Sequence, residues 1–328
     1  MKSIKPLLLS VLALSLILAG CQNEEAADTV PEESVTVNLT LSMSANAIPY
    51  LYIMEEDTLG EDFDLNAQIH ITREEATAKI LKKDVQGSMM SVQESANIFN
   101  KGLPVVLVNA TYGASFFLIS ENEAINTYED LRDRVIWTSM KGGPVAFTMN
   151  QLILNQTSLD PEKDLSYQFM AFGELTNLIL NDLKDIEVYS LRDPYVSQIL
   201  AEKPQARIIL NFDEEWEKAF GNRIPNSGLA MDRDFIDTHP EFITALNEAY
   251  KEAIDWMNDN PGEAAALGSK YLKGQSEAIL RSSIENLNLS LMEGAVEEQL
   301  KDYIGLWLAF NPEMVGSKMP LDEFYHLD

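Results

Sequence analysis

Residues 35–43 read Val-Thr-Val-Asn-Leu-Thr-Leu-Ser-Met, and apolar and polar side chains alternate along them without a break. Because successive side chains of a strand point to opposite faces, this stretch predicts a β-strand with one buried face. Further along, Thr72 and Glu75 have the spacing of a capping box, which predicts the start of a helix. Residues 87–90 then form a short apolar strand, and a second capping-box spacing at Ser91 predicts another helix directly after it. An order of strand, helix, strand, helix therefore begins at residue 35.

The same order continues through the middle of the chain. Apolar runs predict strands at residues 105–108, 115–119, 135–137, 186–189 and 207–210. Pro144 and Pro194 lie where helices are expected to begin, and each is followed by an apolar stripe of helical spacing. After Met231 the strands stop, and helical spacing continues to about Leu308. This alternation predicts an α/β fold with mostly parallel sheets covered on both faces.

A chain of 328 residues corresponds to about two domains at roughly 150 residues each. The helical segment after Met231 is too long to stay unpacked, so we expect it to pack against the strands predicted within residues 35–118. The predicted organisation is lobe one at residues 35–118 plus 228–328 and lobe two at residues 119–227.

The first twenty residues differ from all that follow. Lys2 and Lys5 precede an apolar run over residues 7–18, and small residues come next. A basic start, a short apolar core and small residues are typical of a secretory signal peptide, predicted here at residues 1–20. The run is shorter than the ~20 apolar residues that a transmembrane helix needs.

The segment Leu18-Ala19-Gly20-Cys21 resembles the lipobox of bacterial lipoproteins. The resemblance implies that Cys21 receives a diacylglyceryl group, that the chain is cut before it, and that the new amino terminus is acylated. Two or more acyl chains give durable attachment to a membrane. Residues 22–34 contain little that can be buried and are predicted to be a flexible tether. Cys21 is also the only cysteine, so neither a disulfide nor thiol chemistry is expected.

The charge excludes one large class of partners. The chain has 24 Lys plus Arg against 52 Asp plus Glu, a net charge of -28, and removal of Lys2 and Lys5 with the signal peptide leaves 22 against 52, or -30. Nonspecific binding to nucleic acid needs clusters of basic residues, so no nucleic acid partner is expected. Contact with the membrane is expected through the lipid anchor only.

The sequence lacks the common motifs of catalysis and cofactor binding. The only histidines are His70, His239 and His326, and none has metal-chelating spacing to another. His70 lies in a strand predicted at residues 67–71 and is interpreted as a structural residue. We therefore expect no catalytic residue, no metal and no cofactor.

A family resemblance rests on several stretches that occur in one order: 101–108 (Lys-Gly-Leu-Pro-Val-Val-Leu-Val), Thr111-Tyr112-Gly113, Phe117-Leu118-Ile119, Tyr128-Glu129-Asp130-Leu131-Arg132, Gly143-Pro144, Arg192-Asp193-Pro194-Tyr195 and Thr238-His239-Pro240-Glu241-Phe242. Together with the lipobox, they resemble the nitrate, sulfonate, taurine and thiamine-precursor branch of the solute-binding lipoproteins of ABC importers. The resemblance covers nearly the whole chain after the signal peptide.

The resemblance implies a two-lobed type II periplasmic-binding-protein fold that closes on a small-molecule solute. It also implies a monomer, anchored on the extracytoplasmic face of the cell membrane, that delivers the solute to a membrane permease. The chain departs from the family at Asp193, where the family usually has Glu, and at residues 132–135, Arg-Asp-Arg-Val in place of the common Gly-Lys-x-Ile or Gly-Lys-x-Val. The shorter reach of Asp193 leaves its contact with a ligand open.

In sheets of this kind ligands bind outside the carboxyl ends of the strands, at the N-termini of helices. The loops at these places supply the candidate ligand-binding residues, which are Ser44, Asn46, Ile48, Ser91, Gln93, Thr111, Tyr112, Lys141, Gly142, Gly143, Phe172, Gly173, Asp193 and Tyr195.

These candidates have structural alternatives. The turn at residues 141–143 suits an anion, because glycine lets backbone N–H groups approach and the helix dipole adds about half a positive charge; it is equally a plain tight turn. Ser91 is also an N-cap, and Tyr112 and Phe172 are also core residues. The sequence leaves the ligand open.

Two other functions remain open from the sequence. One is a surface-anchored enzyme, which would need two carboxylates in a cleft at roughly 5 to 9.5 Å. The other is a lipoprotein that senses a ligand and takes no part in transport.

Overall fold

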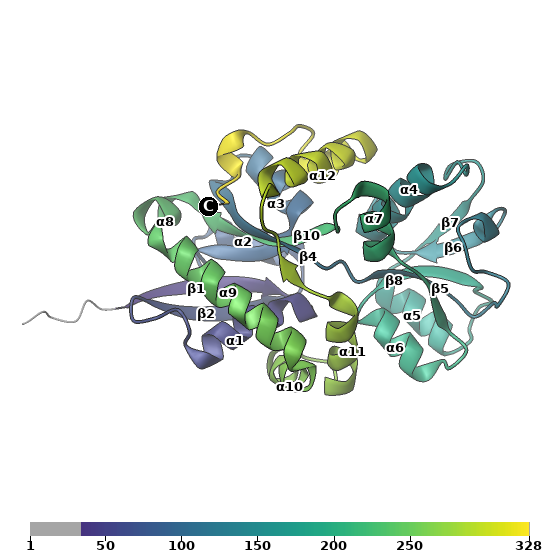
Figure 1. Cartoon of the computed structure of the whole chain (residues 1–328), viewed down its shortest axis with the longest axis horizontal. Coiled ribbons are helices and arrows are strands. Elements are labelled where there is room, and N and C mark those ends of the chain that lie inside the picture. The colour runs from purple at the N-terminus through teal and green to yellow at the C-terminus, as the bar shows by residue number, and fades with distance from the viewer. Residues whose placement is uncertain (1–33, 328) are drawn as a thin grey trace, which may run out of the picture. The chain divides into compact units, whose positions relative to one another are not determined.

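The computed structural model describes residues 34–327, and two β-sheets organise this part of the chain (Figure 1). The first sheet has the strand order β11-β4-β10-β3-β1-β2 and the second has the order β7-β6-β8-β5-β9. The strands of the first sheet are β1 (Val35–Ser42), β2 (Phe63–His70), β3 (Gly87–Ser91), β4 (Val105–Tyr112), β10 (Pro225–Asp232) and β11 (Ser290–Leu291). Those of the second sheet are β5 (Phe116–Ser120), β6 (Val135–Thr138), β7 (Ser166–Phe169), β8 (Val188–Arg192) and β9 (Arg207–Asn211).

Most strands of each sheet run in one direction, as the alternating pattern predicts. The exceptions among residues 34–327 are β5 in the second sheet and β10 and β11 in the first, which pair antiparallel with their neighbours. β5 and β10 follow the two points at which the chain passes from one sheet to the other. Each is the first strand of the sheet that the chain has just entered; β5 follows β4 with no helix between them, and β10 follows α7.

Helices cover both sheets. Those on the first sheet are α1 (Ile48–Glu56), α2 (Arg73–Leu81), α3 (Val92–Asn100), α8 (Arg233–Thr238), α9 (Glu241–Asp259), α10 (Pro261–Tyr271), α11 (Glu277–Leu287) and α12 (Val296–Phe310). Those on the second sheet are α4 (Pro144–Gln156), α5 (Phe172–Leu180), α6 (Tyr195–Glu202) and α7 (Phe212–Phe220). Short 3-10 turns lie at η1 (Ala45–Ala47), η2 (Glu129–Leu131), η3 (Pro312–Val315) and η4 (Asp322–Phe324). Within residues 34–327, no helix is both long enough and apolar enough to cross a membrane.

The two predicted capping boxes differ in outcome. Thr72 accepts a hydrogen bond from the backbone N–H of Glu75 (3.2 Å), so the predicted helix start at Thr72 is confirmed, while the Glu75 carboxylate accepts its bond from the backbone N–H of Ile71 (3.0 Å) and not from that of Thr72. Ser91 is the N-cap residue of α3, but its side chain caps no backbone N–H and instead donates to the Glu94 carboxylate at 3.4 Å. The prediction of a second capping box is therefore wrong, and the first turn of α3 keeps uncapped N–H groups.

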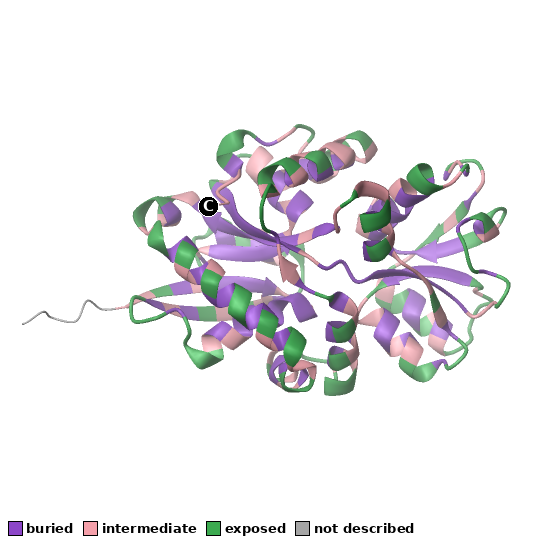
Figure 2. Ribbon diagram, viewed as in Figure 1, coloured by how far each residue is buried: buried purple, intermediate pink, exposed green. Residues whose placement is uncertain are grey.

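Buried residues line the inner faces of the sheets and the stripes of the helices that cover them (Figure 2). One apolar cluster joins the first sheet to α1, α9, α10 and α11, and another joins the second sheet to α5 and α6. A third cluster contains residues from both sheets together with α4, α7 and α12. The two groups of elements are therefore in direct apolar contact.

The expectation that strands stop after Met231 is wrong in one detail, since the two-residue strand β11 pairs with the edge of β4. The chain changes sheet between β4 and β5 and again between α7 and β10. The exact lobe boundaries, at Leu118 and Gly228, remain predictions. The predicted signal peptide and Cys21 lie outside the described residues.

Candidate functional site

A cavity of about 800 Å³ lies between the two sheets, where the carboxyl ends of strands from both sheets meet. The segment after β1 and the start of α3 line it from the first sheet. The end of β8, the start of α6 and the start of α5 line it from the second sheet. A volume of this size is typical of a pocket for a small molecule.

The structure brings seven of the fourteen predicted residues together around this cavity. They are Ser44, Asn46, Ser91, Gln93, Phe172, Asp193 and Tyr195. All seven lie at or next to the carboxyl end of a strand or the first turn of a helix, which is the rule that selected them.

Three other predicted residues lie behind or away from the cavity wall in the first sheet. Ile48 is fully buried in the apolar cluster of α1. Thr111 hydrogen-bonds with the Ser227 hydroxyl at 2.9 Å, and Ser227 itself lines the cavity. The hydroxyl of Tyr112 bonds to Gln299, on α12.

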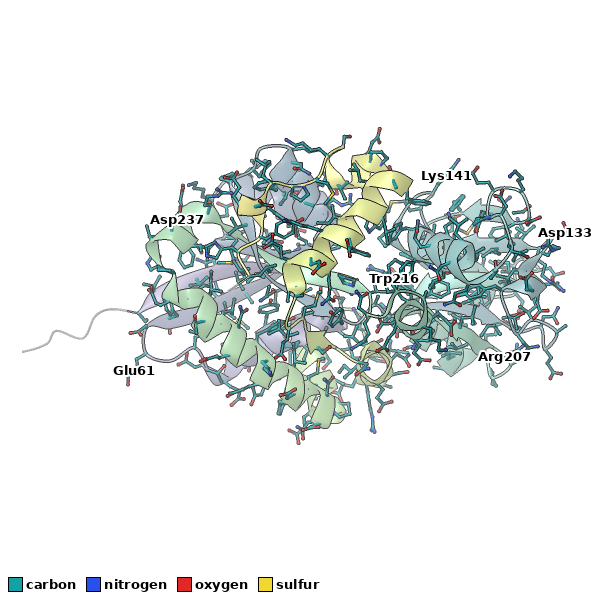
Figure 3. The ribbon with its side chains drawn as sticks, turned by 45° about the horizontal axis from the view of Figure 1, so that its top comes forward. Glu61, Asp133, Lys141, Arg207, Trp216 and Asp237 are labelled. Carbon is teal, nitrogen blue, oxygen red and sulfur yellow. The ribbon has the colours of Figure 1, made fainter. Side chains whose placement is uncertain are left out.

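The predicted anion turn at residues 141–143 does not line the cavity, and neither does Gly173. Lys141 is exposed at the surface (Figure 3). The carbonyl of Gly142 accepts a hydrogen bond from Asn311 (3.3 Å), just beyond α12, and Gly143 is the N-cap of α4. The turn joins two parts of the structure and has the geometry of the tight-turn alternative.

Arg192 is the cationic residue of the cavity that sequence reasoning missed. Its guanidinium lies 5.3 Å above the ring of Phe172, and that ring stacks on Tyr195 at 5.3 Å between centroids and 20° between planes. Within residues 34–327 Arg192 forms no ion pair, although it lines the cavity. The only signal in the sequence was its place at the predicted strand end, directly before Asp193.

The other arginine of the cavity is neutralised. Arg73 forms an ion pair with Glu94 at 3.0 Å. Burial raises the pKa of the Glu94 carboxyl, and the Arg73 charge and the Ser91 hydrogen bond oppose that effect. The pair therefore adds little net charge to the cavity, and Arg192 supplies the uncompensated positive charge.

Polar groups without charge surround these residues. Gln93 is 3% exposed, and its Oε1 has no hydrogen-bond partner among the described residues. Asn46 donates to the Ser227 hydroxyl at 3.4 Å. Gln93 therefore adds a buried, unpaired acceptor to the cavity wall, and the uncapped first turn of α3 adds backbone N–H groups at the same edge.

His70 lines the cavity at the end of β2, and its Nδ1 lies 3.1 Å from the Thr40 hydroxyl. Burial lowers its pKa to about 4, with Glu75 opposing the shift and Lys79 adding to it. At neutral pH the ring is uncharged. The histidine has the buried hydrogen bond expected of a structural residue, and it also forms part of the cavity wall.

Both carboxylate oxygens of Asp193 are already engaged by protein groups. Oδ1 accepts from the backbone N–H (2.9 Å) and the hydroxyl (2.7 Å) of Ser197, and Oδ2 accepts from Asn286 (3.0 Å). Burial raises the pKa of Asp193, and these three hydrogen bonds oppose the rise. The side chain lines the cavity mainly as part of its wall.

Together these groups can bind a small molecule by one charge, an aromatic face and several hydrogen bonds. The two carboxylates at the cavity, Glu94 and Asp193, each have protein partners. In the described part of the chain no group of three His, Cys, Asp or Glu side chains is placed to hold a metal ion.

Comparison with solved structures shows the fold. An ABC transporter from Parabacteroides distasonis superposes with a TM-score of 0.74 at 15% identity, covering 90% of this chain and 99% of that one. The aliphatic sulphonate binding protein SsuA from Escherichia coli gives 0.68 at 11% identity, covering 88% and 98%. The nitrate-binding protein NrtA from Synechocystis gives 0.57 at 15% identity, covering 80% and 74%. The two-lobed periplasmic-binding-protein fold expected from the sequence is thereby confirmed.

No curated protein sequence matches the chain. Residues 72–264, more than half of its length, match the NMT1/THI5-like family. This match agrees with the resemblance drawn from the sequence stretches around Tyr112, Pro144 and Pro194. The chain belongs to the NMT1/THI5-like family.

Proposed function

We propose that the protein is an extracytoplasmic solute-binding lipoprotein that captures a small molecule between its two sheets and delivers it to the permease of an ABC importer. The observation that carries the proposal is the 800 Å³ cavity, whose wall comes from strand ends of both sheets. A ligand that contacts both sides stabilises the closed arrangement by its differential affinity for it. The similar structures, an ABC transporter, a sulphonate-binding protein and a nitrate-binding protein, support the same role.

The chemistry of the cavity favours a ligand that carries an anionic group. Arg192 lines the cavity with no ion pair in the described residues, and a guanidinium binds oxyanions through paired N–H donors. The stacked rings of Phe172 and Tyr195 offer an apolar face beside that charge.

The anchor belongs to the same proposal. Processing before Cys21 and lipidation of its sulfur would hold the protein at the outer face of the cell membrane. The intact mass of the parent protein purified from its membrane should include the diacylglyceryl group, and this mass should be absent from Cys21→Ala. A parent mass without a lipid group would contradict the lipid anchor and leave the binding role intact.

Extraction of the bound solute tests the binding role. The full-length protein is purified from its membrane without denaturant and then unfolded, and the released small molecules are identified by mass spectrometry. Adding the identified molecule back to stripped protein should raise the melting temperature and lower the radius of gyration in small-angle scattering. If no molecule is released, and a broad panel of anions and cell extract changes neither quantity, the proposal fails.

Substitution of Arg192 tests which group of the cavity binds the anion. Arg192→Gln should weaken binding of an anionic solute about 10- to 100-fold, since a hydrogen bond to a charged group contributes about 1.5–3 kcal/mol. Arg132→Gln is the matched control, because Arg132 lies at the surface and pairs with Asp164 (2.8 Å) outside the cavity wall. Equal affinity of the two variants would exclude Arg192 as the group that binds the anion.

A further inference from the structure

Besides the connecting strands, several contacts join the elements of the two sheets, among them the Asn311–Gly142 hydrogen bond and the hydrogen bonds that Arg223, paired with Asp213 of α7, donates to Asn288 and Ser290. Two larger groups of contacts differ in chemistry. The first, here called the aromatic seam, consists of Phe147 and Trp216 from the second-sheet side and Tyr303, Trp307 and Phe310 from α12. Phe147 stacks on Trp307 with 3.9 Å between centroids and 17° between planes, and it meets Phe310 at 5.4 Å. Trp216, labelled in Figure 3, meets Tyr303 at 6.0 Å. Each of Phe147, Trp216 and Trp307 is almost completely buried.

The second contact, here called the polar seam, consists of Asp193 and Ser197 from the second-sheet side and Ser283 and Asn286 from α11. Asn286 donates to Asp193 at 3.0 Å and to the Ser197 hydroxyl at 3.3 Å. The Ser283 hydroxyl lies 3.5 Å from that of Ser197. In Figure 1, α11 lies beside α6 below the connecting strands, and α12 lies near α4 and α7 above them.

Both seams border the cavity. Tyr303 of the aromatic seam lines it, and so do Asp193 and Ser283 of the polar seam. Opening of the cavity therefore has to separate one seam or both.

The two seams respond differently to water. When the polar seam separates, water can replace each lost hydrogen bond, because its donors and acceptors are small and hydrophilic. When the aromatic seam separates, large rings that bury roughly 150–250 Å² each become exposed, and water offers nothing equivalent. Separation at the polar seam is the easier of the two motions.

We infer that Asp193 and Asn286 form a latch that holds the cavity closed, and that the two sides part at the polar seam while turning about the aromatic seam. This inference rests on the proposed function, since it describes how the binding cavity opens. Asp193 is then a positioning residue. It acts by joining α6 to α11 and not by contact with the solute.

The test adds a like charge at the latch in the absence of any solute. Asn286→Asp places a second carboxylate next to Asp193 and should raise the radius of gyration in small-angle scattering. Asn181→Asp is the matched control, because it adds the same charge at an exposed position at the end of α5, outside both seams and the cavity wall. Equal radii for the two variants would overturn the latch.

A second readout follows the aromatic seam in the same samples. Quenching of tryptophan fluorescence by acrylamide should stay at the parent level in Asn286→Asp, because Trp216 and Trp307 remain buried. If quenching rises together with the radius of gyration, the aromatic seam also separates, and the inference that the two sides turn about it is wrong.

A disulfide variant keeps the inference testable if Asn286→Asp does not fold. In a Cys21→Ala background, Ser197→Cys with Ser283→Cys places two thiols where the hydroxyls lie 3.5 Å apart. Oxidation should form the disulfide and abolish any difference in radius between stripped and solute-loaded protein. Failure of the disulfide to form would contradict the closed contact at this seam, and an unchanged difference in radius after it forms would contradict opening there. None of the latch measurements on stripped Asn286→Asp protein depends on a solute, so failure of the latch and failure of the binding role are separate results.

Discussion

The aromatic seam and the polar seam join the same two groups of elements with very different strength. Burying one large aromatic or aliphatic side chain contributes roughly 1.5–3 kcal/mol, and the aromatic seam buries Phe147, Trp216 and Trp307 almost completely. A hydrogen bond contributes about 0.5–1.5 kcal/mol net, and the polar seam has few of them between the two sides. The aromatic seam is therefore the durable contact between the two walls of the cavity, and the polar seam is the contact whose hydrogen bonds water can replace.

The largest effect is expected from breaking the aromatic seam. Phe147→Ala should lower the free energy of unfolding by about 3–5 kcal/mol, because it removes a buried ring and leaves a cavity against Trp307. Chemical denaturation measures the change. Leu154→Ala on the same helix is the control, since Leu154 is 59% exposed and should change stability by less than about 0.5 kcal/mol. Similar losses of unfolding free energy in both variants would mean that Phe147 in the aromatic seam contributes no more to stability than the exposed Leu154.

An intermediate effect is expected at His70, on the first-sheet wall of the cavity. Its pKa is about 4 in the folded protein and 6.5 as the ordinary value, so the unfolded chain binds a proton more readily between these limits. Stability that is present above pH 6.5 is therefore lost as the pH falls toward 4, by at most about 3 kcal/mol. Urea unfolding at pH 7 and pH 4.5 should show a smaller loss for His70→Gln than for the parent, with His239→Gln behaving like the parent. An equal loss of stability in all three proteins would mean that His70 does not cause the pH dependence.

The smallest effect is expected at the polar seam, and it has the opposite sign. Burial raises the pKa of Asp193, so the folded protein holds its proton more tightly than the unfolded chain above the ordinary value of 3.8. The parent should therefore lose stability relative to Asp193→Asn as the pH rises from 3.8 through the raised pKa. Thermal unfolding of both proteins across this range measures the difference. A parent that gains stability relative to the variant would show that hydrogen bonds from Ser197 and Asn286 outweigh burial.

Much of the fold could be predicted because it depends on local patterns. The alternation over residues 35–43 specifies β1, and Thr72 caps the start of α2 as predicted. Pro144 starts α4 because a helix tolerates proline in its first turn. The same patterns could not predict that β5 and β10 run antiparallel, since strand direction follows from where the chain crosses between sheets.

Only part of the candidate site could be predicted from the sequence, because the rule that was used names strand ends and not side-chain directions. The rule for strand ends selected Ser91, Gln93, Phe172 and Asp193, which line the cavity. It also selected Lys141, which lies at the surface, because the rule names a loop and does not say which way its side chains point. Arg192 was missed because the sequence does not show that an exposed arginine at a strand end lies over the Phe172 ring at the edge of the cavity.

The sequence by itself determined the order of most strands and helices and the membership of a family, and it predicts a lipid anchor at Cys21. These properties follow from neighbouring residues, whose spacing is enough to specify a strand, a capping box or a processing motif. Only the tertiary structure decided which charge faces the cavity and that Asp193 meets Asn286, 93 residues away. Burial and pairing of this kind depend on segments far apart in the chain, and periodicity along the sequence carries no information about them.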